Sequence, residues 1–192
     1  MGDAEFDLGI MYILGEGVPR NLAMAFHWLN LMDVYHDTRS FTFEDSNHES
    51  FAATRDYEAA FEEINNESKS GVGIAQVILG LCYQRGYFVY PDDDAAFDWY
   101  EKAANQNSSA GQVKLGDMYN EGISVEEDFR QAVKWYKRAA DQNDPYGNER
   151  LAIMYFFGHG VPANESTGQQ FFAKAQAQNE EPVVDDVRAR TR

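Results

Sequence analysis

Cysteine is almost absent from this sequence, and cations are scarce. The chain has one cysteine and four histidines, and Asp and Glu outnumber Lys and Arg by 32 to 16. A single cysteine excludes both an intramolecular disulfide and a zinc site built from paired cysteines. The formal charge of -16 repels phosphate backbones and anionic lipid, so we expect a protein partner, of basic character, rather than nucleic acid.

Long apolar runs are missing too. No stretch approaches the roughly 18 consecutive apolar residues that a membrane-spanning helix needs, so we expect no membrane insertion. No basic-then-apolar export signal opens the chain. The localisation is left open: periplasmic or secreted if such a signal has been removed, otherwise cytoplasmic.

Catalytic motifs are also lacking. There is no P-loop, nucleophile elbow or dinucleotide fingerprint, and the histidines show neither metal-site nor triad spacing. Cys82 stands in a column that elsewhere holds methionine, which indicates a buried, inert thiol. We therefore predict no enzyme activity, no catalytic residues, no cofactor and no metal. A hydrolase site or weak metal contact near His36 and His48 is the least favoured alternative.

What the chain does contain is a period of about 36 residues. The aromatic residues Trp28, Trp99, Trp135 and Phe171 lie 71, 36 and 36 residues apart. The same spacing relates Leu8-Gly9, Leu79-Gly80, Leu115-Gly116 and Leu151-Ala152, each followed by a tyrosine and then by Gly15, Gly86, Gly122 or Gly158. Internal periods of this length are typical of stacked structural repeats.

Each column has a physical role in a helix-turn-helix unit. Leu, Gly and Tyr share one face of a first helix, where a recurring glycine indicates a close helix crossing. The loop glycine ends that helix in the left-handed region, and Asn21, Asp92, Asp128 and Asn164 cap a second helix. Gly71, Asn107, Asn143 and Asn179 are expected to end the second helix in the same left-handed way. The tryptophan column and the flanking alanines are predicted to form its buried face.

The acidic runs Asp92–Asp94 and Glu126–Asp128 lie where second helices begin. Carboxylates there complement the helix dipole and cap free amides, which favours capping over a cation site.

The period predicts one repeat array over residues 1–179. Clear repeats occupy 1–36, 72–107, 108–143 and 144–179, a degenerate repeat occupies 37–71, and residues 180–192 form a tail or cap. In the degenerate repeat Asp56 and Ala60 keep their columns, which predicts a capped second helix of roughly 56–69, while Glu63 replaces the tryptophan. No single hairpin buries its own apolar face, so neighbours must stack.

The copy from Lys114 to Ala140, KLGDMYNEGISVEEDFRQAVKWYKRAA, resembles the Sel-one-like repeat (SLR), a relative of the tetratricopeptide repeat. Only its second loop glycine is replaced, by Ser124. The resemblance implies an all-α, right-handed α-solenoid of about five hairpins that acts as a non-enzymatic protein-protein interaction scaffold. Some bacterial members are immunity proteins that neutralise a secreted toxin effector, for example one of type VI secretion, and this is the alternative function.

The resemblance also implies which first-helix positions line the concave, partner-binding face. Carried to this sequence they are Ile10, Ile13, Leu14, Val77, Leu81, Gln84, Arg85, Val113, Asp117, Asn120, Glu121, Glu149, Ile153, Phe156 and Phe157. Several are large and apolar, so we hypothesise a groove with apolar ends and an acidic middle for a basic partner. The alternative is that aromatics such as Phe156 pack against a neighbouring helix. We expect a monomer.

Overall fold

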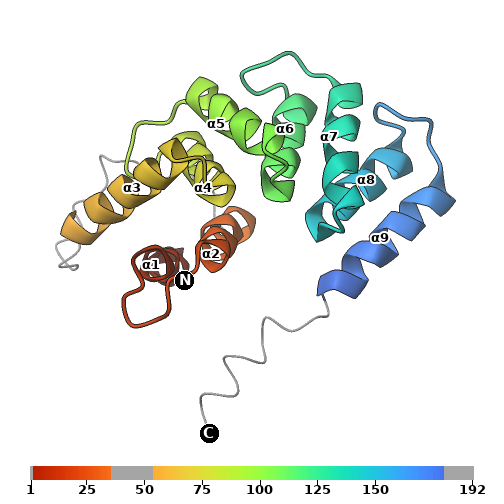
Figure 1. Ribbon diagram of the computed structural model, residues 1–192. Coiled ribbons are helices and arrows are strands. Elements are labelled where there is room, and N and C mark those ends of the chain that lie inside the picture. The colour runs from red at the N-terminus through yellow and green to blue at the C-terminus, as the bar shows by residue number, and fades with distance from the viewer. Residues whose placement is uncertain (1, 36–53, 180–192) are drawn as a thin grey trace, which may run out of the picture. The chain divides into compact units, whose positions relative to one another are not determined.

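The protein is all-α, as predicted. The computed structural model describes residues 2–35 and 54–179, which form nine helices and no strand (Figure 1). They are α1 (Gly2–Leu14), α2 (Leu22–Tyr35), α3 (Thr54–Lys69), α4 (Gly73–Arg85), α5 (Asp93–Asn105), α6 (Ser109–Glu121), α7 (Phe129–Asp141), α8 (Pro145–Phe157) and α9 (Glu165–Asn179). The chain divides into two compact units, Met1–Gly111 and Gln112–Arg192, each described by itself below.

The helix ends follow the predicted backbone chemistry. The first helices stop at Gly15, Gly86, Gly122 and Gly158, whose φ angles lie between 67° and 75°. The second helices are capped by side-chain oxygens of Asn21, Asp92, Asp128 and Asn164, which accept backbone N–H groups at 2.9 to 3.1 Å. Gly71, Asn107 and Asn143 are left-handed, while Asn179 is the last residue of α9.

One predicted cap is wrong. The helix expected in the degenerate repeat is confirmed, but α3 begins at Thr54, so Asp56 lies inside the helix instead of capping it. The rest of that repeat, with His36 and His48, and the tail 180–192 lie outside the described residues. The division into repeats stays a prediction.

The recurring glycines have a direct structural cause, because a large side chain of the second helix lies on the glycine of the first. A Cβ added to Gly80 would approach the Tyr100 ring to 2.6 Å, and one on Gly116 would approach the Tyr136 ring to 2.5 Å. In the first hairpin Leu29 fills the same place over Gly9. The close helix crossing that the glycines predicted is therefore confirmed.

The buried face of the second helices is shifted by one residue from the prediction. Tyr100 and Tyr136 are completely buried, whereas the preceding Trp99 and Trp135 are half-buried. Successive residues of a helix point about 100° apart, so only one of two adjacent aromatics can face the first helix. The alanines on either side, such as Ala132 and Ala139, are buried as expected.

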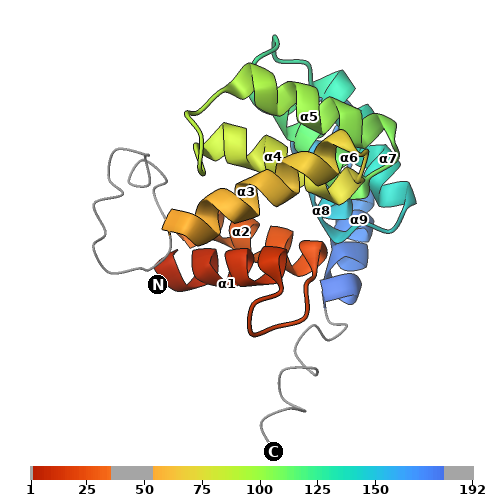
Figure 2. The ribbon, with the colours of Figure 1, turned by 60° about the vertical axis from the view of Figure 1, so that its left-hand side comes forward.

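In the first unit, α1 and α2 pack side by side and α3 lies against α1 (Figure 2). Its core includes Ile13, Leu29, Ile64 and Leu79. Phe88 adds to this core from the loop after α4, at a φ of 65° that side chains rarely adopt. Its ring centroid lies 5.6 Å from that of Phe6 and 6.0 Å from that of Phe61, so the aromatic contacts offset local strain.

The second unit is built in the same way from α6 to α9. Its core includes Ala132, Tyr136, Leu151 and Met154. The start of α8 lies so close to α7 that a Cβ on Gly147 would meet Ala139 at 2.7 Å. Across the described residues, no helix has the length and apolar character that crossing a bilayer requires.

Candidate protein-binding surface

Five of the predicted partner-binding residues belong to the interior and cannot contact a partner in this structure. Ile10, Ile13, Val77, Leu81 and Val113 are each at most 6% exposed. Ile10, Ile13 and Leu81 lie in the hydrophobic core of the first unit. The prediction is wrong for these five because a first helix here packs on more than one side, so positions beyond the Leu-Gly-Tyr face are covered too.

Asp117, another predicted contact, instead holds helices together. Its Oδ1 accepts hydrogen bonds from the Tyr136 hydroxyl at 2.8 Å and from Arg150 Nε at 2.9 Å. Burial and the nearby carboxylate raise the pKa of Tyr136 far above its ordinary value. Burial opposes charge on Arg150, but Asp117 outweighs it, and the pKa of Arg150 is raised. This network joins α6, α7 and α8.

Gln84 has a similar role in the first unit, where its Oε1 accepts a hydrogen bond from the Tyr100 hydroxyl at 3.0 Å. Both buried tyrosines therefore find a polar partner on the preceding first helix. Leu14 packs against the core, and Arg85 is half-buried.

The residues that remain accessible are concentrated in the second unit. Three are exposed, namely Glu121 on α6 and Phe156 and Phe157 on α8, while Asn120, Glu149 and Ile153 are half-buried. Phe156 is 38% exposed and Phe157 is 69% exposed. Phe156 also lies against α9, since a Cβ on Gly168 would be 2.7 Å from its ring. Phe156 is thus partly exposed and also packs against a neighbouring helix, so it combines the two alternatives that the sequence left open.

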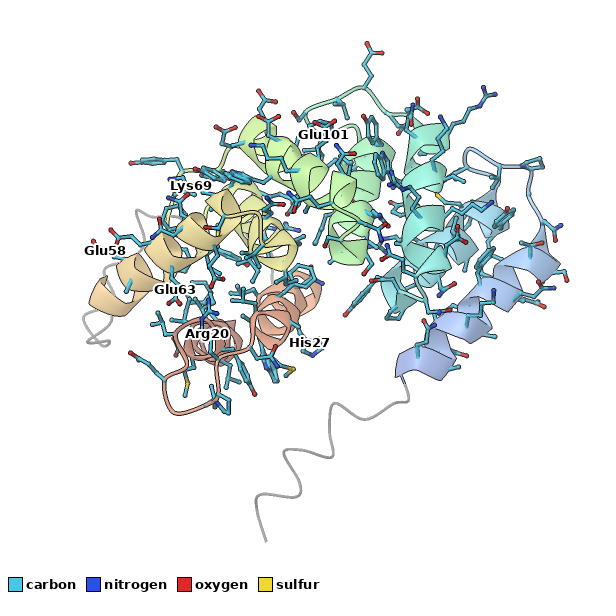
Figure 3. The ribbon with its side chains drawn as sticks, in the orientation of Figure 1. Arg20, His27, Glu58, Glu63, Lys69 and Glu101 are labelled. Carbon is cyan, nitrogen blue, oxygen red and sulfur yellow. The ribbon has the colours of Figure 1, made fainter. Side chains whose placement is uncertain are left out.

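Two sets of contacts between helices were not predicted from the sequence. Arg20 binds Glu63 at 3.0 Å and Glu67 at 2.7 Å, so the glutamate at the lost tryptophan position of α3 is paired from the α1–α2 loop (Figure 3). Hydrogen bonding to Glu67 raises the pKa of Arg20 despite some burial. The replacement of Trp by Glu63 was visible in the sequence, but its partner was not.

The second is a buried amide column, Gln76, Gln112 and Asn148, three residues before each core leucine. Gln142 Nε2 donates to Gln112 Oε1 at 2.8 Å, and Asn148 Nδ2 donates to Gln178 Oε1 at 3.3 Å. These pairs join the start of each first helix to the end of its second. The partners Gln142 and Gln178 also lie 36 residues apart. This shared spacing of the buried amides and their partners was the signal in the sequence that could have revealed the pairs.

The side chains that carry chemistry elsewhere have structural surroundings here. Cys82 is buried in the first core, as predicted, and burial raises the pKa of its thiol to about 12, so it stays protonated at neutral pH. Within residues 2–35 and 54–179, no three His, Cys, Asp or Glu side chains gather as a metal site would require.

Comparison with known families matches the Sel1 repeat at residues 2–32, 73–108, 109–144 and 145–179, which is more than half of the chain. The chain belongs to the Sel1 repeat family. The predicted resemblance and the α-solenoid fold class are thereby confirmed. Proteins of this family generally act in protein-protein interaction and are typically not enzymes. A search of curated proteins finds no significant match.

Three solved structures are similar to this chain. A Sel1 repeat protein from Oxalobacter formigenes is 24% identical with a TM-score of 0.60, covering 92% of this chain and 51% of its own. A protective antigen with an SLR fold from uropathogenic Escherichia coli is 29% identical with a TM-score of 0.60, covering 92% and 38%. Helicobacter pylori cysteine rich protein B is 26% identical with a TM-score of 0.53, covering 66% and 91%. The chain thus spans about half or less of the first two proteins.

Proposed function

We propose that this protein is a non-enzymatic scaffold that binds a partner protein through accessible side chains of its first helices, chiefly at the C-terminal end of α8. The observation that carries the proposal is the exposure of Phe156 and Phe157 at two adjacent first-helix positions. Large aromatic side chains left in water are costly, and protein interfaces are enriched in them. The family's general role in protein interaction supports the same conclusion.

The partner should be basic near this surface. Glu149 lies on α8 with the two phenylalanines, Glu121 is exposed on α6, and the whole chain carries a charge of -16. Such a charge speeds encounter with a cationic partner and fades with added salt. We therefore expect a segment that presents apolar side chains flanked by Lys or Arg.

The test compares Phe157→Ala with Tyr90→Ala in quantitative affinity purification. Phe157 and Tyr90 are both largely exposed, at 69% and 71%, so neither substitution should affect folding. We expect one protein to be recovered with the parent and with Tyr90→Ala but depleted several-fold with Phe157→Ala, as for a central aromatic contact. Equal recovery by all three would disprove binding at the end of α8.

A narrower form of the proposal is an immunity protein that masks a secreted toxin effector. The large negative charge favours it, because tight electrostatic complementarity suits the inhibition of one cationic target. If the protein recovered above is toxic when expressed alone, co-expression of this chain should restore growth, and Phe157→Ala should restore it less. A non-toxic partner would leave only the general scaffold.

A further inference from the structure

The exposed side of α7 is unusual in a chain of this charge. Arg130, Lys134, Lys137 and Arg138 are all exposed on this one helix of 13 residues, and together they define its basic face. They account for four of the 16 Lys and Arg residues. Their spacing of i, i+4, i+7 and i+8 places them along one side of the helix.

The basic face lies beside an aromatic ring. Trp135 is half-buried, and the Arg138 guanidinium lies 4.6 Å from its ring centroid. A surface depression of about 390 Å³ is lined by Gln131, Lys134, Trp135, Lys137, Arg138 and Asp141. The helix therefore offers positive charge together with an accessible apolar surface.

None of the four cations forms an ion pair with a residue in the described part of the chain. Lys134 makes one long hydrogen bond, 3.4 Å, to Gln131. Arg20 and Arg150 behave differently, since both are paired with carboxylates inside their units. The charges of α7 are thus not used to hold its own unit together.

Other repeats show that the fold does not require these charges. On α5 the equivalent positions, 36 residues earlier, hold Asp94, Asp98 and Glu101, the last labelled in Figure 3. On α9 they hold Ser166, Gln170 and Ala173. All three helices still form the same hairpin, with a cation over the aromatic column in each. Basic residues at the positions of Arg130, Lys134 and Lys137 are therefore specific to α7, whereas the position of Arg138 is basic in all three helices.

We propose that the basic face of α7 docks an acidic helical segment of a partner protein, with carboxylates facing Arg130, Lys134 and Lys137 and an apolar side chain against Trp135. From residue 130 to residue 137 a helix rises about 10 Å, so carboxylates at i, i+4 and i+7 of another helix match the span. This surface lies on a second helix, whereas the surface proposed above lies on first helices.

An acidic helix fits this face better than nucleic acid does. Glu127 and Asp128 precede the helix and Asp141 ends it, so negative charge brackets both ends of the basic face. A phosphate backbone extending past either end would meet these carboxylates and the overall charge of -16. A short acidic segment the length of the face avoids both.

Two variants test the face with little risk to folding, because their residues come from equivalent positions of this chain. The neutral variant R130S/K134Q/K137A carries the residues of α9, and the acidic variant R130D/K134D/K137E carries those of α5. Circular dichroism melting should confirm that both fold. The probe is a labelled, alanine-based helical peptide with Glu at i, i+4 and i+7 and one Leu beside them, measured by fluorescence anisotropy at low salt.

We expect the parent to bind this peptide, the neutral variant to bind roughly tenfold more weakly and the acidic variant not to bind, since three exposed pairs each add a modest factor. A peptide with the same residues scrambled should bind less, and Tyr90→Ala, an exposed aromatic of the first unit, should bind like the parent. No binding by the parent, or equal binding by the neutral variant, would overturn the proposal. So would tighter binding of single-stranded DNA than of the peptide, or self-association of the parent that the same variants abolish.

Discussion

The α6–α7 hairpin and the α8–α9 hairpin differ at two equivalent positions, one on the first helix and one on the second. In α6 and α7, Gly116 lies under Tyr136, which is completely buried. In α8 and α9, the equivalent residues are Ala152, which is buried, and Phe172, which is 43% exposed. Ala152 carries a Cβ where Gly116 has none. We infer that this methyl group keeps the aromatic ring of α9 from packing as Tyr136 does.

The comparison predicts its largest effect at the rings themselves. Tyr136→Ala should lower the free energy of unfolding by about 3 to 5 kcal/mol, because it empties a fully buried site. Phe172→Ala removes a ring that is partly in water and should cost about 1 kcal/mol or less. Urea unfolding of both variants measures the difference. Equal losses would show that Phe172 is as much a core residue as Tyr136.

The methyl group itself can be moved from one hairpin to the other. In an exposed helix, Gly→Ala stabilises by about 1 kcal/mol, but Gly116→Ala should destabilise by about 1 to 3 kcal/mol since its Cβ would lie 2.5 Å from the Tyr136 ring.

The reverse change, Ala152→Gly, serves as the matched control. It should lower the free energy of unfolding by about 1 kcal/mol, because glycine has a lower helix propensity than alanine. Packing of the Phe172 ring into the freed space would offset part of this loss. Thermal or urea unfolding gives the sign of each effect. A stabilised Gly116→Ala variant would contradict the close crossing of α6 and α7.

The smallest expected effect is on the pH dependence of the stability of the first unit, through His27. Burial lowers the pKa of His27 below 6.5, so the unfolded chain binds a proton more readily than the folded one. Its contribution to stability is therefore full above about pH 6.5 and declines as the pH falls below that value.

His27→Asn should remove this part of the acid sensitivity. The measurement is urea unfolding of both proteins at several pH values between 5 and 7.5. An unchanged pH profile in the variant would show that His27 is equally solvated in both states.

The predictions that held concern local backbone chemistry. The caps at Asn21 and Asp128 and the left-handed Gly86 and Gly158 depend only on residues a few positions away, so a single repeat contains all the information needed. Asp56 failed because the cap column was carried into a repeat whose first half has lost the motif, and there α3 begins earlier.

The sequence did not show which residues of the predicted binding surface are buried, because burial depends on residues far away along the chain. Leu81 and Phe157 are both apolar first-helix residues, and nothing in their own repeats says that one is buried and the other exposed. That depends on which helices from other parts of the chain cover each position.

The sequence alone determined the period, the helix pairs and their ends, because hydrogen-bonding side chains and glycine act on their immediate neighbours. Only the tertiary structure decided that Tyr100, not Trp99, faces Gly80, that Arg20 compensates for Glu63, and that Asp117 is a structural residue. Each of these depends on where side chains from separate helices meet, and that position is set by packing rather than by local preference.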